Sequence, residues 1–183
     1  MKRQIRRSCF ETNSSSTHAI CITKSDVDKN SLPNHVTFTH GEFGWENAEY
    51  SDLWDKASYL YEAIYDCYED NEIKEIINQI TETLSNYGIS CNFESNKSRW
   101  GGGYIDHGGD TIDFVKAVLD DEDKLLRYLF GDSMVITGND NDDGYSDRMY
   151  VNEGEEVTKW GTYTNYGGLK PEFNNYEIYE KWN

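Results

Sequence analysis

Three groups of acidic side chains have the spacing expected of a binding surface. The groups are Asp66, Glu69, Asp70, Glu72 and Glu75; Asp120, Asp121, Glu122 and Asp123; and Asp140, Asp142 and Asp143. Helical residues three or four positions apart place their Cβ atoms roughly 5–6 Å apart, and duplex DNA carries one charge per roughly 1.7 Å of its axis. Carboxylates in such rows can occupy a basic groove built for phosphates. The alternative is that they are solvated faces of helices and loops.

A second set of polar residues could serve an enzyme. The segment from Ser14 to His18 contains three serines and a histidine, and Asp106 and His107 lie among glycines. A serine near a histidine suggests a nucleophile and its base, but sequence neighbours rarely meet in that arrangement, and no G-x-S-x-G turn surrounds them. A polar turn that enters a strand at Ala19, with side chains bonded to local backbone, is favoured. We therefore expect no catalytic residues, with a small enzyme using these two segments as an alternative.

The loop from Asn139 to Gly144 superficially resembles a calcium-binding loop. If Gly144 held the sixth loop position, the twelfth would be Tyr150, where a bidentate glutamate is needed. The sequence also contains no H-E-x-x-H motif and no paired Cys/His spacing of a zinc site. We expect neither a metal nor another cofactor, and we interpret the loop as a solvated hairpin tip.

The net charge is unevenly distributed along the chain. The 183 residues contain 34 Asp and Glu against 17 Lys and Arg, giving −17, but residues 1–40 carry a net +3 and the rest carry −20. Solubility needs a net charge of only about 2–8 in magnitude, so the excess suggests an anionic surface for a basic partner. Ordinary solubility remains the alternative. Arg3, Arg6 and Arg7 in the basic start could bind nucleic acid or pair with the acidic body.

The composition indicates a folded protein outside the membrane. Mean hydropathy is −0.82, yet 14% of residues are aromatic and only two are proline, which is unlike a disordered acidic chain. No run of roughly 18 apolar residues could span a bilayer. No apolar segment follows the basic start, so we expect no signal peptide and a cytoplasmic location.

The hydrophobic pattern predicts one α+β domain over residues 1–183. Strands are expected at 19–23, 35–39, 89–93 and 133–137, and helices at 51–67, 70–87 and 110–119 with a further turn or two at 125–130. The strand at 133–137 is expected to form a hairpin with residues 148–151. We therefore predict a mainly antiparallel sheet packed against three or four helices. Residues 1–18 form a basic arm and polar turn in this prediction, and residues 152–183 an aromatic, glycine-rich C-terminal segment.

One aromatic stripe of the first expected helix could form a contact between molecules. Trp54, Tyr61, Tyr65 and Tyr68 are spaced to share one side of that helix. Amphipathic rings suit a partner surface or a homodimer contact. Packing of the stripe under the C-terminal aromatic residues is the equally favoured alternative.

The N-terminal segment carries a resemblance to a known group. The residues from Arg6 to His18 read R-R-S-C-F-E-T-N-S-S-S-T-H. This resembles the opening of small phage and prophage proteins of Gram-positive bacteria, which carry a basic residue or two and then F-E-T-N-S-S-S-x-H. The segments Y-I-D-H from Tyr104, L-F-G from Leu129 and I-T-G-N-D from Ile136 also look like parts of that group. The resemblance implies an origin in a mobile genetic element.

Within this setting the chain looks like an anti-CRISPR protein that acts on a type II-A effector nuclease. Such nucleases hold guide RNA and DNA in strongly basic channels, which offer a target to an acidic protein. The resemblance implies a non-enzymatic inhibitor that binds the nuclease–guide RNA complex and blocks recognition of target DNA, with an acidic DNA-mimicking surface and a possible second contact to nucleic acid through the N-terminal arginines. A small phage enzyme and a self-associating phage accessory protein are the alternatives.

Overall fold

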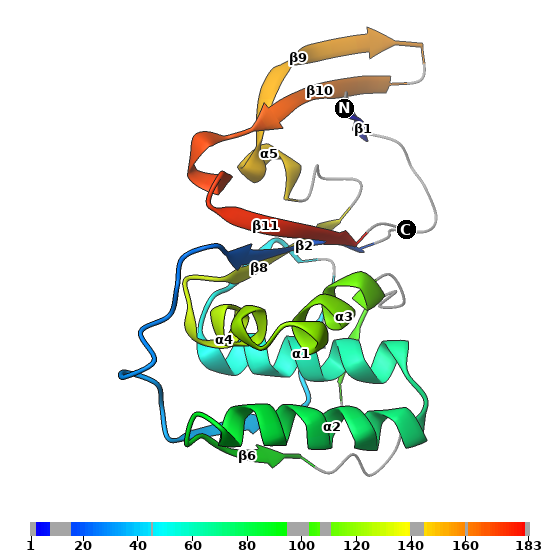
Figure 1. The fold of residues 1–183 in the computed structure, drawn as a ribbon. Helices are drawn as coiled ribbons and strands as arrows, with labels where there is room; N and C mark the ends of the chain where they lie inside the picture. The colour runs from blue at the N-terminus through cyan, green and yellow to red at the C-terminus, as the bar shows by residue number, and fades with distance from the viewer. Residues whose placement is uncertain are drawn as a thin grey trace.

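A four-stranded antiparallel sheet lies at the centre of the computed structural model, with helices on one of its faces and a smaller β layer on the other (Figure 1). The structure describes residues 3–7, 16–44, 46–94, 103–106, 111–139, 145–159 and 161–181, with backbone alone for 3–7, 139 and 161. The elements in chain order are β1 (Arg3–Arg7), β2 (Ser16–Thr23), β3 (His35–Phe38), β4 (Glu42–Phe43), β5 (Ala48–Tyr50), α1 (Leu53–Cys67), α2 (Asp70–Ser85), β6 (Ser90–Phe93), β7 (Tyr104–Ile105), α3 (Ile112–Asp120), α4 (Glu122–Phe130), β8 (Met134–Asn139), α5 (Ser146–Met149), β9 (Tyr150–Thr158), β10 (Gly161–Leu169), η2 (Pro171–Phe173) and β11 (Tyr176–Lys181). The predicted α+β class is confirmed.

Strand β2 is the most buried strand of the fold. The central sheet has the order β11-β2-β8-β5, and all eight residues of β2 are buried. Ile20 and Ile22 join the core under the helices, whereas Ala19 and Cys21 join a second core on the opposite face, as the two-residue period of a strand requires. A strand covered on both faces reads as a continuous apolar run, which is why this segment was recognisable in the sequence.

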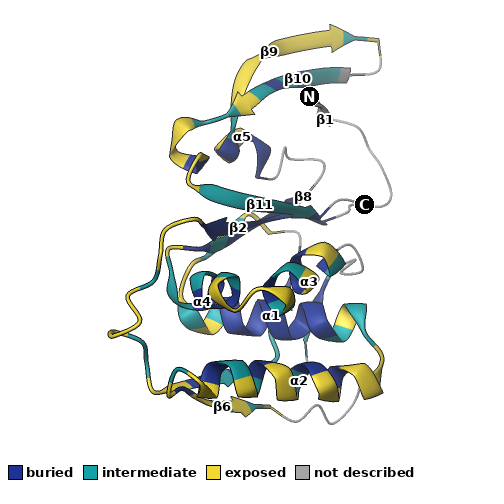
Figure 2. Cartoon of the chain, viewed as in Figure 1, coloured by how far each residue is buried: buried dark blue, intermediate teal, exposed yellow. Residues whose placement is uncertain are grey.

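The helices form two layers below the central sheet. Helices α1, α3 and α4 cover the sheet, and α2 lies beyond α1 (Figure 1). Ala57, Leu60 and Ile64 of α1 are buried, and α1 is mostly dark blue in Figure 2. Asp52 caps α1 by accepting a hydrogen bond from the Asp55 N–H, and Glu69 begins α2 in a capping box with Glu72.

The tyrosines of α1 pack inside the protein. Tyr61 is buried against Phe38 and Phe93 of the parallel β3–β6 pair, and Tyr65 contacts Tyr61 edge to face. Of the predicted stripe only Trp54 is largely exposed. The rings of Tyr61 and Tyr65 therefore contribute to the core on the β3–β6 side, and none of their ring contacts within the described residues comes from the C-terminal segment.

The expected hairpin between residues 133–137 and 148–151 does not form. Strand β8 pairs with β2 on one side and β5 on the other, so it has no free edge for another strand. Residues 146–149 instead form the short helix α5, and Met149 is buried in the second core together with Tyr145. The hairpin partner of β9 is β10.

The C-terminal segment is mostly β-structure. Strand β10 pairs with β9 and with β1, and β11 returns to pair with β2. Register shifts at Asn165/Tyr166 and Tyr166/Leu169 break the two-residue alternation of β10, which explains why its sequence shows no clear period. Strand β9 is exposed along most of its length (Figure 2). Within the described residues, no helix is long and apolar enough to cross a bilayer.

Candidate functional site

Two of the three predicted acidic groups lie on helix ends at the surface. Glu69, Asp70, Glu72 and Glu75 are exposed at the start of α2, and residues 120–123 are exposed where α3 ends and α4 begins. Asp121 begins α4 by accepting a hydrogen bond from the Lys124 N–H at 2.9 Å. Acidic residues in a first helical turn also interact favourably with the helix dipole. Part of the acidic excess therefore has a structural role.

Packing of α2 against α3 and α4 brings these two groups onto one surface. Gln79 of α2 donates a hydrogen bond to the Leu119 carbonyl at 2.7 Å, and the Tyr87 hydroxyl donates to Glu122 at 3.4 Å. Burial raises the pKa of Tyr68, and Cys67 and the charges of Glu72 and Asp120 raise it further, so both carboxylates act on the same tyrosine. We name this surface the acidic face; it comprises Glu69, Asp70, Glu72, Glu75, Asp120 and Glu122.

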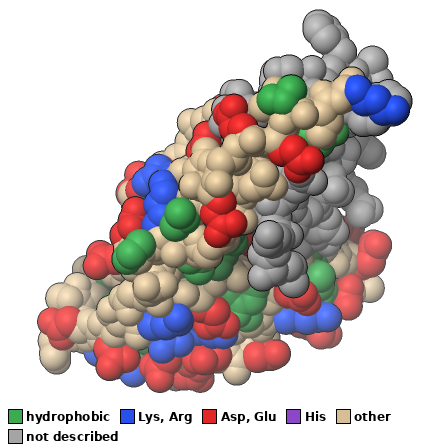
Figure 3. Space-filling view, turned by 90° about the horizontal axis from the view of Figure 1, so that it is seen from above, with side chains coloured by type: hydrophobic (Ala, Val, Ile, Leu, Met, Phe, Trp, Pro, Cys, Tyr) green, Lys and Arg blue, Asp and Glu red, His purple; other side chains and the backbone are tan. Residues whose placement is uncertain are grey.

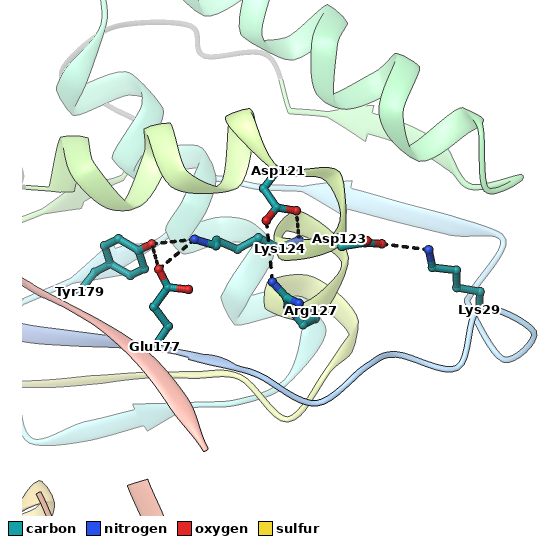
Figure 4. Close-up of polar contacts among 7 residues, drawn as sticks. All are labelled: Lys29, Asp121, Asp123, Lys124, Arg127, Glu177 and Tyr179. Atoms are coloured by element: carbon teal, nitrogen blue, oxygen red, sulfur yellow. Dashed lines mark hydrogen bonds and ion pairs between the residues drawn. The ribbon is translucent and has the colours of Figure 1, made fainter. Parts of the chain in front are cut away.

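Basic side chains neutralise only part of the neighbouring charge. Lys29 pairs with Asp123 at 2.9 Å, and Lys124 pairs with Glu177 at 2.8 Å and donates to the Tyr179 hydroxyl at 3.0 Å (Figure 4). In the part of the chain that the structure describes, no residue of the acidic face forms an ion pair. On the face seen from above, Figure 3 shows Asp and Glu side chains interspersed with Lys and Arg. The carboxylates of the acidic face thus have no ion-pair partner among the described residues, and their role in binding a partner stays a prediction.

Asp66 belongs to a different environment from the rest of its predicted group. Its carboxylate accepts a hydrogen bond from the Ile105 backbone of β7, away from α2. Desolvation by the surrounding protein, together with the nearby Glu62 charge, raises its pKa to about 6. Asp140, Asp142 and Asp143 lie outside the described residues, as does most of the loop in which calcium was considered.

The N-terminal arginines occupy an outer strand. Strand β1 pairs with β10 so that Arg6 lies opposite Tyr163, and Tyr163 in turn lies opposite Glu156 of β9. Neighbouring strands are about 4.8 Å apart, so Arg6 and Glu156 share one row of the sheet with a single strand between them. Arg3 and Arg7 occupy other rows of the same strand, opposite Tyr166 and Thr162. Pairing with acidic residues and contact with nucleic acid both stay predictions for these arginines.

The serine–histidine segment forms part of β2 and makes long-range contacts. The strand begins at Ser16, not at Ala19 as predicted. Ser16 Oγ donates to the Asp106 carbonyl at 2.7 Å and accepts a hydrogen bond from Lys181 Nζ, also at 2.7 Å. Ser16 and Lys181 are both fully buried. The structure therefore joins the two polar segments of the enzyme alternative, through the backbone of Asp106. Ser14, Ser15 and His107 lie outside the described residues.

His18 is not placed to act as the base for a serine. Its Nδ1 contacts the Tyr59 hydroxyl and its Nε2 the Gly44 carbonyl, each at 2.9 Å. Burial lowers its pKa to about 3, and the nearby Lys181 charge lowers it further, so the ring is neutral. Since a carbonyl can only accept, Nε2 carries the proton and Nδ1 accepts from Tyr59. Both ring nitrogens are occupied, and the motif residues Ser16 and His18 tie β2 to α1, β7 and β11.

One buried contact of a carboxylate was not predicted from the sequence. His40 Nδ1 lies 2.7 Å from Glu62 Oε1, and the two side chains are 5% and 4% exposed. The Gly41 N–H donates to the same oxygen at 3.0 Å, and the His40 N–H donates to Glu94 at 3.1 Å. Burial raises the pKa of Glu62, while these hydrogen bonds oppose the shift. The only indication in the sequence was the position of Glu62, a charged residue in a part of α1 whose other residues pack close to the core.

Glu62 orients the His40 ring, and Gly103 packs closely against this pair. A Cβ atom at Gly103 would collide with Glu62 Oε1 and come within 2.5 Å of the Gly41 carbonyl. Tyr61 and Tyr65 flank the His40 ring at 4.8 and 5.3 Å between ring centroids. Such a fixed imidazole can stabilise the β3–β4 connection against α1.

Neither a cofactor nor a relative accounts for the acidic face. Over the described ranges, no group of three His, Cys, Asp or Glu side chains could hold a metal ion. Comparison of the chain with protein-family models, with curated proteins and with solved structures found no match. The candidate function is therefore inferred from the arrangement of charges on this surface.

Proposed function

We propose that this protein is a phage-encoded anti-CRISPR inhibitor that binds a guide-loaded type II-A effector nuclease in the host cytoplasm and blocks recognition of target DNA. The observation that carries the proposal is the acidic face, where carboxylates from two separate sequence segments share one exposed surface without counter-ions among the described residues. The N-terminal resemblance to phage proteins supports the biological setting.

The chemistry of the acidic face fits a groove that binds nucleic acid. Effector nucleases hold their guide and target in basic channels. Carboxylates one helical turn apart at the start of α2, together with Asp120 and Glu122 at the α3–α4 junction that packs against the later part of α2, present negative charge along a surface much as a phosphate backbone does. Association between such surfaces is fast and weakens as salt is added.

The test is cleavage of target DNA by the guide-loaded nuclease across a titration of this protein. The test variant combines Glu75→Gln, Asp120→Asn and Glu122→Gln, which removes three exposed charges and spares the helix caps formed by Asp121 and Glu69. The matched control removes three exposed charges elsewhere, with Glu42→Gln, Glu153→Gln and Glu172→Gln.

We expect the wild-type protein to inhibit near one-to-one stoichiometry and the control to behave like it. The test variant should need about tenfold more protein, since loss of charge pairing at an interface costs about 1–2 kcal/mol. Inhibition by catalytic amounts would favour the enzyme alternative. Absence of inhibition, or equal loss in both triple variants, would contradict the proposal.

A further inference from the structure

A cavity of about 350 Å³ lies between the connection that follows β2 and the outer side of α4. It is lined by Asp26, Val27, Lys29, Asp123, Leu126 and Arg127. Figure 4 shows three of these side chains, with the Lys29–Asp123 pair on one side and Arg127 beside it. The cavity is separate from the contacts made by the acidic face, and its size is typical of a site for a small molecule.

The charges that border the cavity do not all have partners. Lys29 and Asp123 neutralise each other at 2.9 Å, and each shifts the pKa of the other in the direction that favours its charged form. Asp26 forms no ion pair with any residue that the structure describes. The Asp26 carboxylate and the Arg127 guanidinium border the same cavity without an ion pair between them, and Arg127 pairs at 3.9 Å with Asp121, which does not line the cavity.

Arg127 has unused hydrogen-bond donors. Its Nε is buried without a partner among the described residues, and its Nη2 lies 3.9 Å from Asp121 Oδ2, which is beyond hydrogen-bonding distance. The positive charge of Arg127 in the last turn of α4 interacts favourably with the helix dipole, but this interaction does not require its side-chain N–H groups as hydrogen-bond donors. A planar guanidinium with free donors is suited to a carboxylate.

We propose that this cavity binds a small zwitterion, namely a free α-amino acid with an aliphatic side chain. Arg127 would hold the carboxylate, Asp26 the ammonium group, and Val27 with Leu126 the aliphatic part. The carboxylate of Asp26 would repel a simple anion, and the guanidinium of Arg127 would repel a simple cation. A ligand that carries both charges satisfies both residues. This site does not depend on the proposed inhibitor function.

The test follows the methyl NMR signals of Val27 and Leu126 during titration of the full chain with L-leucine. Two matched ligands each lack one charged group: isopentylamine has no carboxylate, and 4-methylpentanoate has no ammonium. We expect saturable shifts with L-leucine in the millimolar range. Each truncated ligand should bind about tenfold more weakly, since a hydrogen-bonded charged contact is lost.

Variants assign the two ends of the ligand. Arg127→Gln should weaken L-leucine about tenfold and leave isopentylamine unchanged, whereas Asp26→Asn should weaken L-leucine about tenfold and leave 4-methylpentanoate unchanged. Arg148→Gln is the matched control, because Arg148 is an exposed arginine that pairs with Glu49 elsewhere. Asp26 lies on an exposed loop, so its variant keeps the test valid if Arg127→Gln does not fold. Equal binding of 4-methylpentanoate and L-leucine, or no saturable shift, would overturn the proposal.

Discussion

Lys181 Nζ donates a hydrogen bond to Ser16 Oγ at 2.7 Å and joins two residues that are 165 positions apart. The same nitrogen donates to the Ser16 carbonyl at 2.9 Å, and neither residue is exposed to solvent. A buried ammonium is unfavourable unless it is hydrogen-bonded. The contact therefore locks the end of β11 against the start of β2, within the central sheet.

The first prediction concerns this contact. Lys181→Met should lower the free energy of unfolding by about 3 kcal/mol, because it leaves the buried carbonyl and hydroxyl of Ser16 without their donor. Lys170→Met is the control, since Lys170 also donates to a backbone carbonyl, that of Asp147, but in an exposed position. It should cost less than about 0.5 kcal/mol. Urea unfolding of both variants measures the difference, and equal losses would refute a special role for the buried lysine.

The helices could be predicted because each carries its own signal. In α2, Ile73, Ile76, Ile80 and Leu84 are all buried, and Gly88, at φ +76°, follows the helix as its sequence position indicated. The strand partners could not be predicted in the same way. Strand β8 pairs with β2 and β5, which precede it by about a hundred residues, and nothing local in residues 133–151 distinguishes that pairing from a hairpin.

The residues of the candidate site could be predicted from the sequence, but their arrangement on one surface could not. The sequence identified the acidic groups at 69–75 and 120–123, but their common surface depends on α2 packing against α3, through contacts such as Gln79 with the Leu119 carbonyl. The His40–Glu62 pair was missed because it joins the end of a strand to the middle of a helix. Neither residue belongs to a motif, and only the folded chain brings them together.

The second prediction tests the close packing around Glu62. Gly103→Ala should destabilise the fold by about 4 kcal/mol, because the added Cβ would collide with Glu62 Oε1 and the residue has φ +150°. Gly154→Ala should cost about 1–3 kcal/mol, since φ is +122° but the space is open. Gly168→Ala has neither problem and should change stability by less than about 0.5 kcal/mol. Thermal or urea unfolding gives the order, and a Gly103 variant as stable as the Gly168 variant would contradict it.

The third prediction is a pair of pH dependences with opposite signs. The folded-state pKa of Asp66 is raised to about 6, so its charge opposes folding at neutral pH, and this penalty disappears as the pH falls toward the ordinary value of 3.8. Asp66→Asn should therefore be stabilising near neutral pH, with the gain vanishing in acid. Lys29 lowers the pKa of Asp123, so Asp123→Asn should be destabilising at neutral pH, with the loss vanishing in acid.

Each variant is compared with the wild type at the same pH. The effect of the overall net charge of −17 is then common to both proteins, and the difference in unfolding free energy reports the single carboxyl group. Unfolding free energies between about pH 7 and pH 2 provide the measurement, because the loss caused by Asp123→Asn vanishes only below the ordinary pKa of 3.8. Parallel curves for Asp66→Asn and the wild type would show that the Asp66 carboxyl has an ordinary pKa. The same sign for both variants would contradict the environments described for them.

The last prediction separates two neighbouring charges of the acidic face. Asp120 is the final residue of α3, where the helix dipole is negative and Glu72 lies nearby, whereas Glu122 is the first residue of α4, where the dipole is positive. Asp120→Asn should therefore stabilise the fold, and Glu122→Gln should destabilise it, each by about 0.5 kcal/mol at low salt. Both effects should shrink at about 1 M salt. Urea unfolding at the two salt concentrations measures the effects, and equal signs would contradict the assignment. The two effects on stability nearly cancel in the double variant that combines Asp120→Asn with Glu122→Gln. A loss of nuclease inhibition by this variant would therefore report the lost surface charge and not a loss of folding.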